Sequence, residues 1–172
     1  IMNGDIVGYK LVSTFLISDF ATPIAKFITN FGGAIFIIIL TVVLFVLIKN
    51  KKIGISIISN LVIITAINQI LKRIVQRPRP TEYRIIEETG YSFPSGHSMV
   101  SMAFYGYLIY LIYKYVKNKD LKWISIVLLS ILICSIGISR IYLGVHYTSD
   151  VLGGFLISVS YLVIYISAVI KS

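Results

Sequence analysis

Three short strings in the chain combine residue types that suit chemistry at a phosphate. They are Lys72 with Arg79-Pro80, then Pro94-Ser95-Gly96-His97, then Ser139-Arg140 followed by His146 and Asp150. Together they supply three cations, two imidazoles and a carboxylate, all at the edges of strongly apolar segments. Ionisable groups beside a bilayer are energetically costly, so by default they mark a functional site. Two histidines among three cations suit an anionic phosphorus centre.

The two histidines have different neighbours, and this difference predicts different roles. His146 and Asp150 are spaced i, i+4, which places them on one face if the backbone there is helical. A carboxylate that holds one imidazole nitrogen makes the other nitrogen a better nucleophile or base. His97 stands at the expected start of a helix, and Glu88 is the closest acid in the sequence. We therefore expect His146 to be the nucleophile. His97 is expected to protonate the leaving oxygen and later to activate water.

The remaining residues of the three strings fit phosphate binding. Lys72, Arg79 and Arg140 are expected to neutralise the phosphoryl oxygens, over which charge spreads during transfer. Gly96 lets the backbone approach an oxyanion closely. Ser95 has two open interpretations, since it could cap the helix or donate to a phosphate oxygen.

Each catalytic candidate also has an ordinary interpretation when it is taken alone. Asp150 follows Thr148 and Ser149 before the last apolar run, where it could cap a helix, and His146 could be a structural histidine at the interface. The His-x3-Asp spacing also permits a metal site that includes His97, although three cations at the same place would repel a divalent ion. We therefore expect no metal and no cofactor.

The elements that must position these residues are strongly apolar. Of the 172 residues, 57% are hydrophobic and the mean hydropathy is +0.89, whereas soluble domains are about 45–50% apolar. This predicts one integral membrane domain over residues 1–172. The net charge of +9 comes from bases that flank apolar runs, which favours anionic lipid head groups over nucleic acid. Arg73, Arg77 and Arg84 are expected to contact head groups or solvent.

Apolar runs of roughly 17–25 residues predict membrane spans. We expect an all-helical bundle with five of them, at about 33–48, 53–71, 98–116, 123–138 and 151–170. Asp19, Pro23 and Lys26 interrupt residues 11–30, which we interpret as an interfacial amphipathic helix.

The distribution of basic residues predicts the orientation in the membrane. A raw count gives equal numbers of Lys and Arg on the two sides, so the positive-inside rule alone is not decisive. Once Lys72, Arg79 and Arg140 are set aside as site residues, the lysine clusters at 49–52 and 114–122 dominate. This predicts that the clusters are cytoplasmic and that the three strings lie on the external side.

Taken in order, the three strings resemble the signature of the type 2 phosphatidic acid phosphatase (PAP2) family. Its pattern is Lys-x6-Arg-Pro, then Pro-Ser-Gly-His, then Ser-Arg-x5-His-x3-Asp. This chain matches every spacing, with Lys72, Arg79-Pro80, Pro94 to His97, Ser139-Arg140, His146 and Asp150. Pro-Ser-Gly-His alone would be a weak signal, but all three strings in order are highly specific.

The resemblance implies a helical bundle, usually of six spans, and metal-independent dephosphorylation through a phosphohistidine. A further span before Ile1 would reconcile six with the five expected here. The resemblance assigns the nucleophile to His146, its orienting partner to Asp150 and the acid/base to His97. It assigns phosphate binding to Lys72, Arg79, Ser95, Gly96, His97 and Arg140. The compact length resembles bacterial cell-membrane members that act on phosphatidylglycerol phosphate, phosphatidic acid or undecaprenyl diphosphate.

Three functions are compatible with the pattern. A lipid phosphatase would release free phosphate, whereas a lipid phosphotransferase would yield a phosphorylated acceptor. A transporter or lipid-phosphate binding module would need the basic residues but would tolerate loss of His146 and Asp150. A pure binder has no use for a paired acid and base, so we favour the phosphatase.

Overall fold

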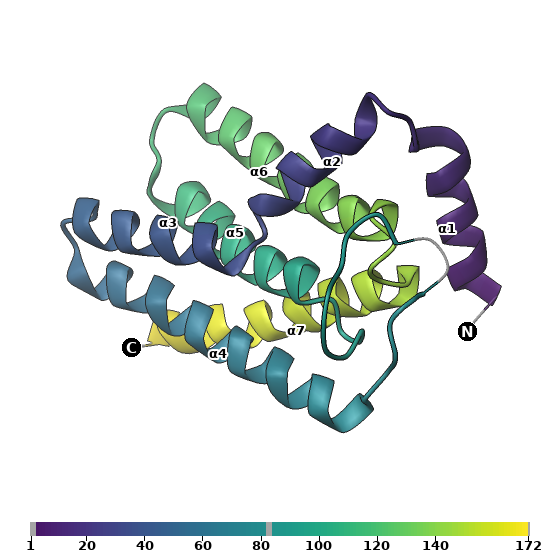
Figure 1. Ribbon diagram of the computed structural model, residues 1–172. Coiled ribbons are helices and arrows are strands. Elements are labelled where there is room, and N and C mark those ends of the chain that lie inside the picture. Colours follow the sequence, from purple (N-terminus) through teal and green to yellow (C-terminus); the bar gives the residue numbers. More distant parts are fainter. Residues whose placement is uncertain (1–2, 82–83, 172) are drawn as a thin grey trace.

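The protein is described by a computed structural model that covers residues 3–81 and 84–171. Within these residues the regular elements are seven helices (Figure 1). They are α1 (Asn3–Leu16), α2 (Ala21–Asn30), α3 (Ala34–Leu47), α4 (Lys51–Val75), α5 (Gly96–Tyr115), α6 (Lys119–Tyr142) and α7 (Thr148–Lys171). The predicted all-helical fold is confirmed.

Short polar residues set the ends of the long helices. Asn50, Ser95 and Asn118 precede α4, α5 and α6, and each side chain accepts a hydrogen bond from a backbone N–H of the first turn. After α4, Gln76 adopts a left-handed backbone conformation with a φ of 50°. Pro78 follows and cannot continue a helix. The segment 76–95 therefore leaves the bundle as an irregular connection.

Helix α5 is the centre of the bundle and packs against α4, α6 and α7. Phe104, Tyr105 and Tyr107 of α5 are almost completely buried. The Tyr107 hydroxyl donates to Ser56 Oγ of α4 at 2.8 Å, so the buried ring also has a polar partner. Because successive helices alternate in direction, the end of α4, the start of α5, the end of α6 and the start of α7 meet at one end of the molecule (Figure 1).

The number of helices that could span a membrane is smaller than the five expected. In the described part of the chain, α4, α6 and α7 are each long and apolar enough. Helices α2 and α3 pass the same test only as a pair bent by 48°, which makes the count three or up to four. The 14 residues of α3 reach only about 21 Å, short of the hydrocarbon thickness. Helix α5 carries serines and tyrosines because it is enclosed by other helices rather than by lipid.

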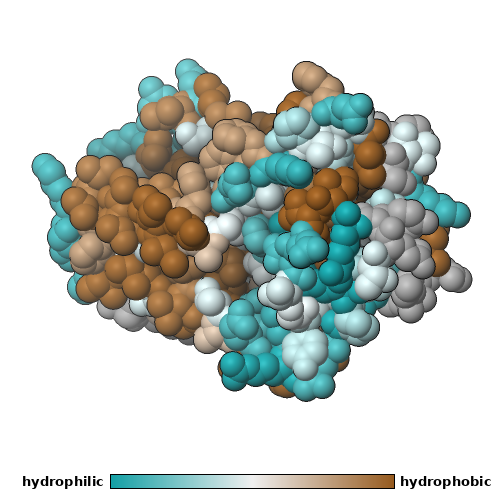
Figure 2. All heavy atoms as spheres, viewed as in Figure 1, coloured by the Kyte–Doolittle hydropathy of each residue, from teal (hydrophilic) through white to brown (hydrophobic). Residues whose placement is uncertain are grey.

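The outer surface of the bundle is apolar. Figure 2 shows hydrophobic atoms gathered on the side where α3 and α4 lie, and hydrophilic atoms over the end that holds the segment 76–95. Large side chains such as Ile35, Leu47 and Val62 are more than half exposed there. An apolar surface of this extent fits contact with lipid. The protein is therefore an integral membrane protein.

The single interfacial helix expected over residues 11–30 is wrong, because the chain breaks there. Helix α1 ends at Leu16 and α2 begins at Ala21, whose N–H donates to Ser18 Oγ at 3.1 Å. Pro23 lies in the first turn of α2, where its missing N–H has no cost. Helix α2 packs on α6, and α1 contacts both α6 and α7.

Candidate active site

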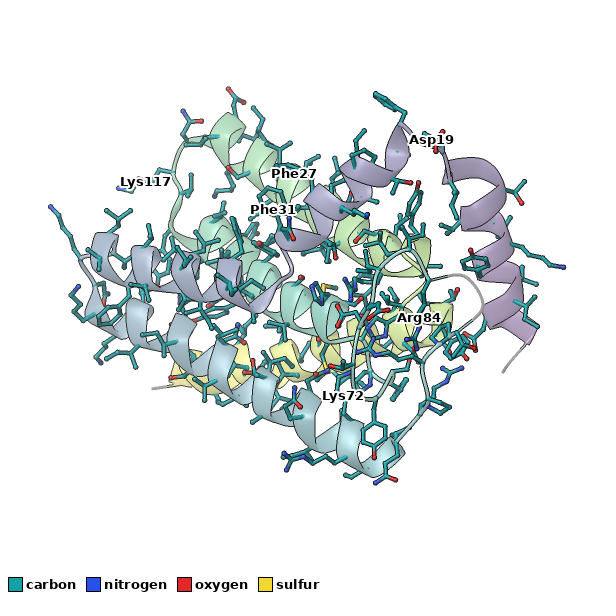
Figure 3. The ribbon with its side chains drawn as sticks, viewed as in Figure 1. Asp19, Phe27, Phe31, Lys72, Arg84 and Lys117 are labelled. Atoms are coloured by element: carbon teal, nitrogen blue, oxygen red, sulfur yellow. The ribbon has the colours of Figure 1, made fainter. Side chains whose placement is uncertain are left out.

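A pocket of about 360 Å³ lies where the four helix ends meet. Six of the predicted site residues line it: Lys72, Arg79, Gly96, His97, Arg140 and His146. They come from the end of α4, the segment 76–95, the start of α5, the end of α6 and the loop before α7. Figure 3 shows Lys72 on α4 beside the segment 76–95. The fold thus joins all three sequence strings at one cavity.

His146 presents its Nε2 atom to the cations of this pocket. Arg79 Nη1 lies 3.0 Å from Nε2. Because a guanidinium only donates, Nε2 must be the acceptor, and the proton of the neutral ring is assigned to Nδ1. Nδ1 lies 3.5 Å from Asp150 Oδ2 but makes no hydrogen bond at this geometry. Asp150 therefore faces the nitrogen of His146 that carries the proton.

The surroundings of His146 keep its ring neutral. The residue is only 3% exposed. Burial lowers the pKa of His146 to about 4, and the positive charges of Arg140 and Arg79 act in the same direction, whereas Asp150 opposes them. A neutral imidazole whose Nε2 carries no proton at pH 7 is the form that a nucleophile requires.

Asp150 is completely buried and accepts hydrogen bonds on both oxygens. Oδ2 accepts from Ser92 Oγ and, at 2.9 Å, from the backbone N–H of Tyr147. Oδ1 accepts from Arg77 Nη1 at 2.7 Å. Donors on every side fit an ionised carboxylate held in a fixed orientation.

Backbone carbonyls and one hydroxyl hold the two pocket arginines. Arg79 donates to the carbonyls of Thr89 and Val145 at 2.9 and 3.0 Å. Arg140 is 1% exposed and donates to Thr29 Oγ1 of α2 at 2.9 Å, while its Nε has no partner within the described residues. The guanidinium groups are thus fixed before any ligand arrives, and Arg140 keeps donor capacity.

An acid to which the sequence analysis gave no role lies between these arginines. Glu88 lines the pocket, and its Oε1 pairs with Arg140 Nη2 while Oε2 lies 3.9 Å from Arg79 Nη2. Burial raises the pKa of Glu88, but the positive charges around it, above all Arg140, more than offset this effect, so the net pKa is below its usual value. The two arginines therefore hold an anionic group of the protein itself when no ligand is present.

Ser95 and Gly96 have separate roles at the start of α5. The Ser95 hydroxyl caps the helix, since it accepts from Ser98 N–H at 3.4 Å and from Ser98 Oγ at 2.9 Å. Ser95 is completely buried, so the geometry supports the capping interpretation. Gly96 lines the pocket, and a Cβ there would lie 3.3 Å from Asn68 Oδ1 of α4. His97 follows at the helix N-terminus, where backbone N–H groups favour an anion.

Besides Glu88, two charged residues near the site were given no role there from the sequence. The prediction that Arg77 contacts head groups or solvent is wrong, because it forms ion pairs with Asp150 and Asp5, at 2.7 and 2.6 Å. The available signals were weak: Arg77 belongs to an Arg-Pro-Arg-Pro run, and Asp5 is an acid in an uncharged stretch. Neither signal indicates that Arg77 and Asp5 contact each other.

Comparison with known proteins identifies the family. Residues 52–172 match the PAP2 superfamily, and the chain therefore belongs to it. The chain is 40% identical over 93 residues to phosphatidylglycerophosphatase B of Bacillus subtilis (strain 168), a match that covers 52% of this chain and 44% of that protein. It is 27% identical over 158 residues to an undecaprenyl-diphosphatase of Sulfolobus acidocaldarius, covering 88% of this chain and 69% of that protein.

Solved structures agree with this assignment. The crystal structure of a transmembrane PAP2-type phosphatidylglycerolphosphate phosphatase from Bacillus subtilis has a TM-score of 0.87 and 27% identity, covering 97% of this chain and 85% of that one. LpxE of Aquifex aeolicus has a TM-score of 0.78 at 20% identity, covering 97% and 99%, and indicates the fold alone. The bundle is therefore the fold of the PAP2 membrane phosphatases.

Proposed function

We propose that the protein is a membrane phosphatase that hydrolyses a phosphomonoester or diphosphate of a lipid through a phosphohistidine. The observation that carries the proposal is the arrangement of His146. Its Nε2 faces a pocket lined by Lys72, Arg79 and Arg140, while its Nδ1 faces Asp150. A second imidazole, His97, lines the same pocket. This combination suits nucleophilic attack on a phosphate whose charge is neutralised by fixed donors.

In the first half-reaction, the substrate phosphate binds among the three cations and the first turn of α5. Arg79 turns its donor from Nε2 to a phosphate oxygen, which uncovers the Nε2 lone pair of His146. Nε2 then forms a bond to phosphorus as the bond between phosphorus and the leaving oxygen breaks. His97 gives its proton to that oxygen, and Asp150 stabilises the positive charge that develops on His146.

In the second half-reaction, His97 acts as the base. It takes a proton from a water molecule whose oxygen bonds to phosphorus as the nitrogen–phosphorus bond breaks. Inorganic phosphate leaves, His97 is protonated again and His146 returns to its neutral form. These steps use only side chains of this chain, so the mechanism requires no metal.

The surroundings of the pocket support a lipid as the carrier of the phosphate. The pocket lies at one end of a bundle whose outer surface is apolar, so a lipid in the bilayer could bring its head group to this end. Relatives are named for phosphatidylglycerol phosphate and undecaprenyl diphosphate, and these two lipids with phosphatidic acid are the proposed substrates. The proposed location is the bacterial cell membrane, with the pocket on the external side.

Phosphate release by the purified protein tests the proposal. The assay uses phosphatidylglycerol phosphate and undecaprenyl diphosphate in detergent micelles with EDTA present, and folded His146→Ala protein is the control. Release that disappears in the control would support a metal-independent histidine phosphatase. Transfer of phosphate to an added acceptor would instead indicate a phosphotransferase, and lipid binding without turnover would indicate a binding module.

A further inference from the structure

We propose that Arg77 is a positioning residue that moderates the pull of Asp150 on His146, and that Asp5 of α1 balances the charge of Arg77. The part of this inference that concerns turnover rests on the proposed function. The part that concerns the protonation of His146 stands on the geometry alone. Helix α1, none of whose described side chains lines the pocket, thereby becomes part of the site.

The contacts of Arg77 fix its guanidinium directly behind the carboxylate of Asp150. Nη1 donates to Asp150 Oδ1 at 2.7 Å and to Ser149 Oγ at 2.6 Å, while Nη2 donates to Asp5 Oδ2 at 2.6 Å. The guanidinium also lies over the Tyr147 ring, 4.1 Å from its centroid. Arg77 therefore bridges two carboxylates and is held in one orientation.

Asp5 is held just as firmly from the other side. It is 3% exposed, and its Oδ1 accepts from the backbone N–H of Ser149 at 2.9 Å. Burial raises the pKa of Asp5, but the hydrogen bonds from Ser149 and Arg77 more than offset this and keep its pKa below the usual value. A Cβ on Gly8 would lie 2.1 Å from Thr148 Oγ1, so α1 lies directly against the start of α7. These contacts lock α1 to the turn that carries the catalytic pair.

The two oxygens of the Asp150 carboxylate face different charged partners. Arg77 binds Oδ1, whereas His146 faces Oδ2. The positive charge of Arg77 weakens the attraction between Asp150 and a proton on His146, and the negative charge of Asp5 weakens the effect of Arg77. Removing Arg77 and removing Asp5 must therefore change the protonation of His146 in opposite directions.

Other charged groups act on His146 as well, and they stay constant in this comparison. The groups that face it are Asp150 of α7, Arg79 of the segment 76–95, Arg140 of α6 and His97 of α5. Lys72 of α4 and Glu88 face the same pocket. Neither Arg77 nor Asp5 lines the pocket, so replacing them leaves the substrate contacts in place.

The chain contains only two histidines, which makes a direct titration feasible. Protein labelled with 15N at histidine and free of any histidine tag is titrated by NMR, and a His97→Gln variant assigns the signals. We expect Arg77→Met to raise the His146 midpoint by about one pH unit and Asp5→Asn to lower it by about half a unit. Arg84→Met removes an exposed arginine of the same segment and should leave the midpoint unchanged.

Turnover gives a second readout. Arg77→Met should lower kcat about tenfold and change KM less than about twofold, because Asp150 loses its orienting partner but the phosphate cradle is intact. Arg77→Lys keeps the charge without the planar fork, so it should keep the midpoint and lose part of kcat. In the titration, shifts of the His146 midpoint in the same direction for Arg77→Met and Asp5→Asn, or no shift in either, would overturn the proposal.

If Arg77→Met does not fold, a downward shift of the His146 midpoint in Asp5→Asn supports the proposal and an unchanged midpoint overturns it. Absence of phosphate release by the wild type would instead count against the proposed function, because the titration needs no substrate.

Discussion

The two histidines of the pocket differ in what lies behind each ring. His146 has a buried carboxylate at Nδ1 and a guanidinium at Nε2, whereas His97 begins a helix whose N–H groups favour an anion. The first environment suits a nucleophile that must carry positive charge in an intermediate. The second suits a group that exchanges protons next to a bound phosphate. The surroundings of each ring therefore support the proposed order, in which His146 attacks first and His97 exchanges protons.

This division predicts that the two histidine variants fail at different steps. His146→Ala should form no phosphoenzyme. His97→Ala should still be phosphorylated by undecaprenyl diphosphate, whose phosphate leaving group needs little protonation, but should lose about 10²–10⁴-fold in turnover because water is not activated. Acid-labile, alkali-stable 32P retained on quenched protein measures the intermediate. Equal loss of labelling in both variants would contradict the assigned roles.

The neutral state of His146 also predicts the pH dependence of activity. Because burial lowers its pKa to about 4, the ring is neutral above this value, and attack by Nε2 is lost only as pH falls through it. Burial and the positive charge of Arg140 also lower the pKa of His97, to about 3 before any ligand binds, so its protonation for the leaving group depends on the negative charge of the bound phosphate. The profile of kcat, which reports the enzyme–substrate complex, should therefore be bell-shaped, with His146 in the acidic limb and His97 in the alkaline limb. Initial rates with one lipid over about pH 3–9, limited to the range in which the protein stays folded, provide the test. A flat profile would argue against two-histidine chemistry.

At the scale of elements, the segment 76–95 contributes both a binding group and a competitor. It supplies Arg79 to the pocket, and it also supplies Glu88, whose carboxylate pairs with Arg140 and lies near Arg79. Substrate phosphate and Glu88 thus compete for the same two guanidinium groups. Entry of a phosphate requires that the carboxylate yields at least one of them.

Neutralising Glu88 should therefore strengthen the binding of small anions. We expect Glu88→Gln to lower the inhibition constant of inorganic phosphate about three- to tenfold, since the amide competes less for the guanidinium groups. Glu87→Gln alters the adjacent, exposed acid and serves as the matched control. Inhibition constants are measured with a single lipid substrate at fixed pH. Weaker phosphate binding in Glu88→Gln would mean that Glu88 supports the bound state instead of competing with it.

Elements also explain which parts of the fold could be predicted from the sequence. The three strings could be recognised from local spacing. His146 and Asp150 lie four positions apart, and Ser95, Gly96 and His97 are consecutive. Helices α4, α6 and α7 could also be predicted, because each contains a long continuous apolar run. The burial of α5 could not be inferred from its composition alone, since Tyr107 finds its hydrogen-bond partner on α4 and Tyr105 donates to the carbonyl of Phe31 beyond α2.

Contacts between positions far apart in the sequence could not be predicted. Arg77 and Asp5 are separated by 72 positions, and Arg140 and Thr29 by 111, so no local pattern links them. The break between α1 and α2 depends likewise on Ser18, whose backbone N–H lies 3.2 Å from the hydroxyl of Tyr142 on α6. Site residues that act through long-range ion pairs become visible only when the helices are assembled.

At the scale of the whole molecule, the bundle has two chemically different ends. The pocket end holds the segment 76–95, and the far end holds the lysine-rich turns before α4 and between α5 and α6. Figure 3 shows Arg84 near the first end and Lys117 at the other. With Lys72, Arg79 and Arg140 set aside, the positive-inside rule favours a cytoplasmic location for the plain lysine clusters, and this is the basis for the proposed external location of the pocket.

Cysteine labelling of intact cells tests this orientation. Cys134, which is exposed, is first replaced by Ser so that only introduced thiols react. In that background, Arg84→Cys should react with a membrane-impermeant maleimide, whereas Lys117→Cys should react only after the cells are opened. Both positions are exposed in the structure, so a difference between them reports the membrane and not burial. Labelling of Lys117→Cys alone would place the pocket in the cytoplasm, where it would meet lipid phosphates of the inner leaflet. The proposed chemistry would stand in that case, but the accessible substrates would be those of the other leaflet.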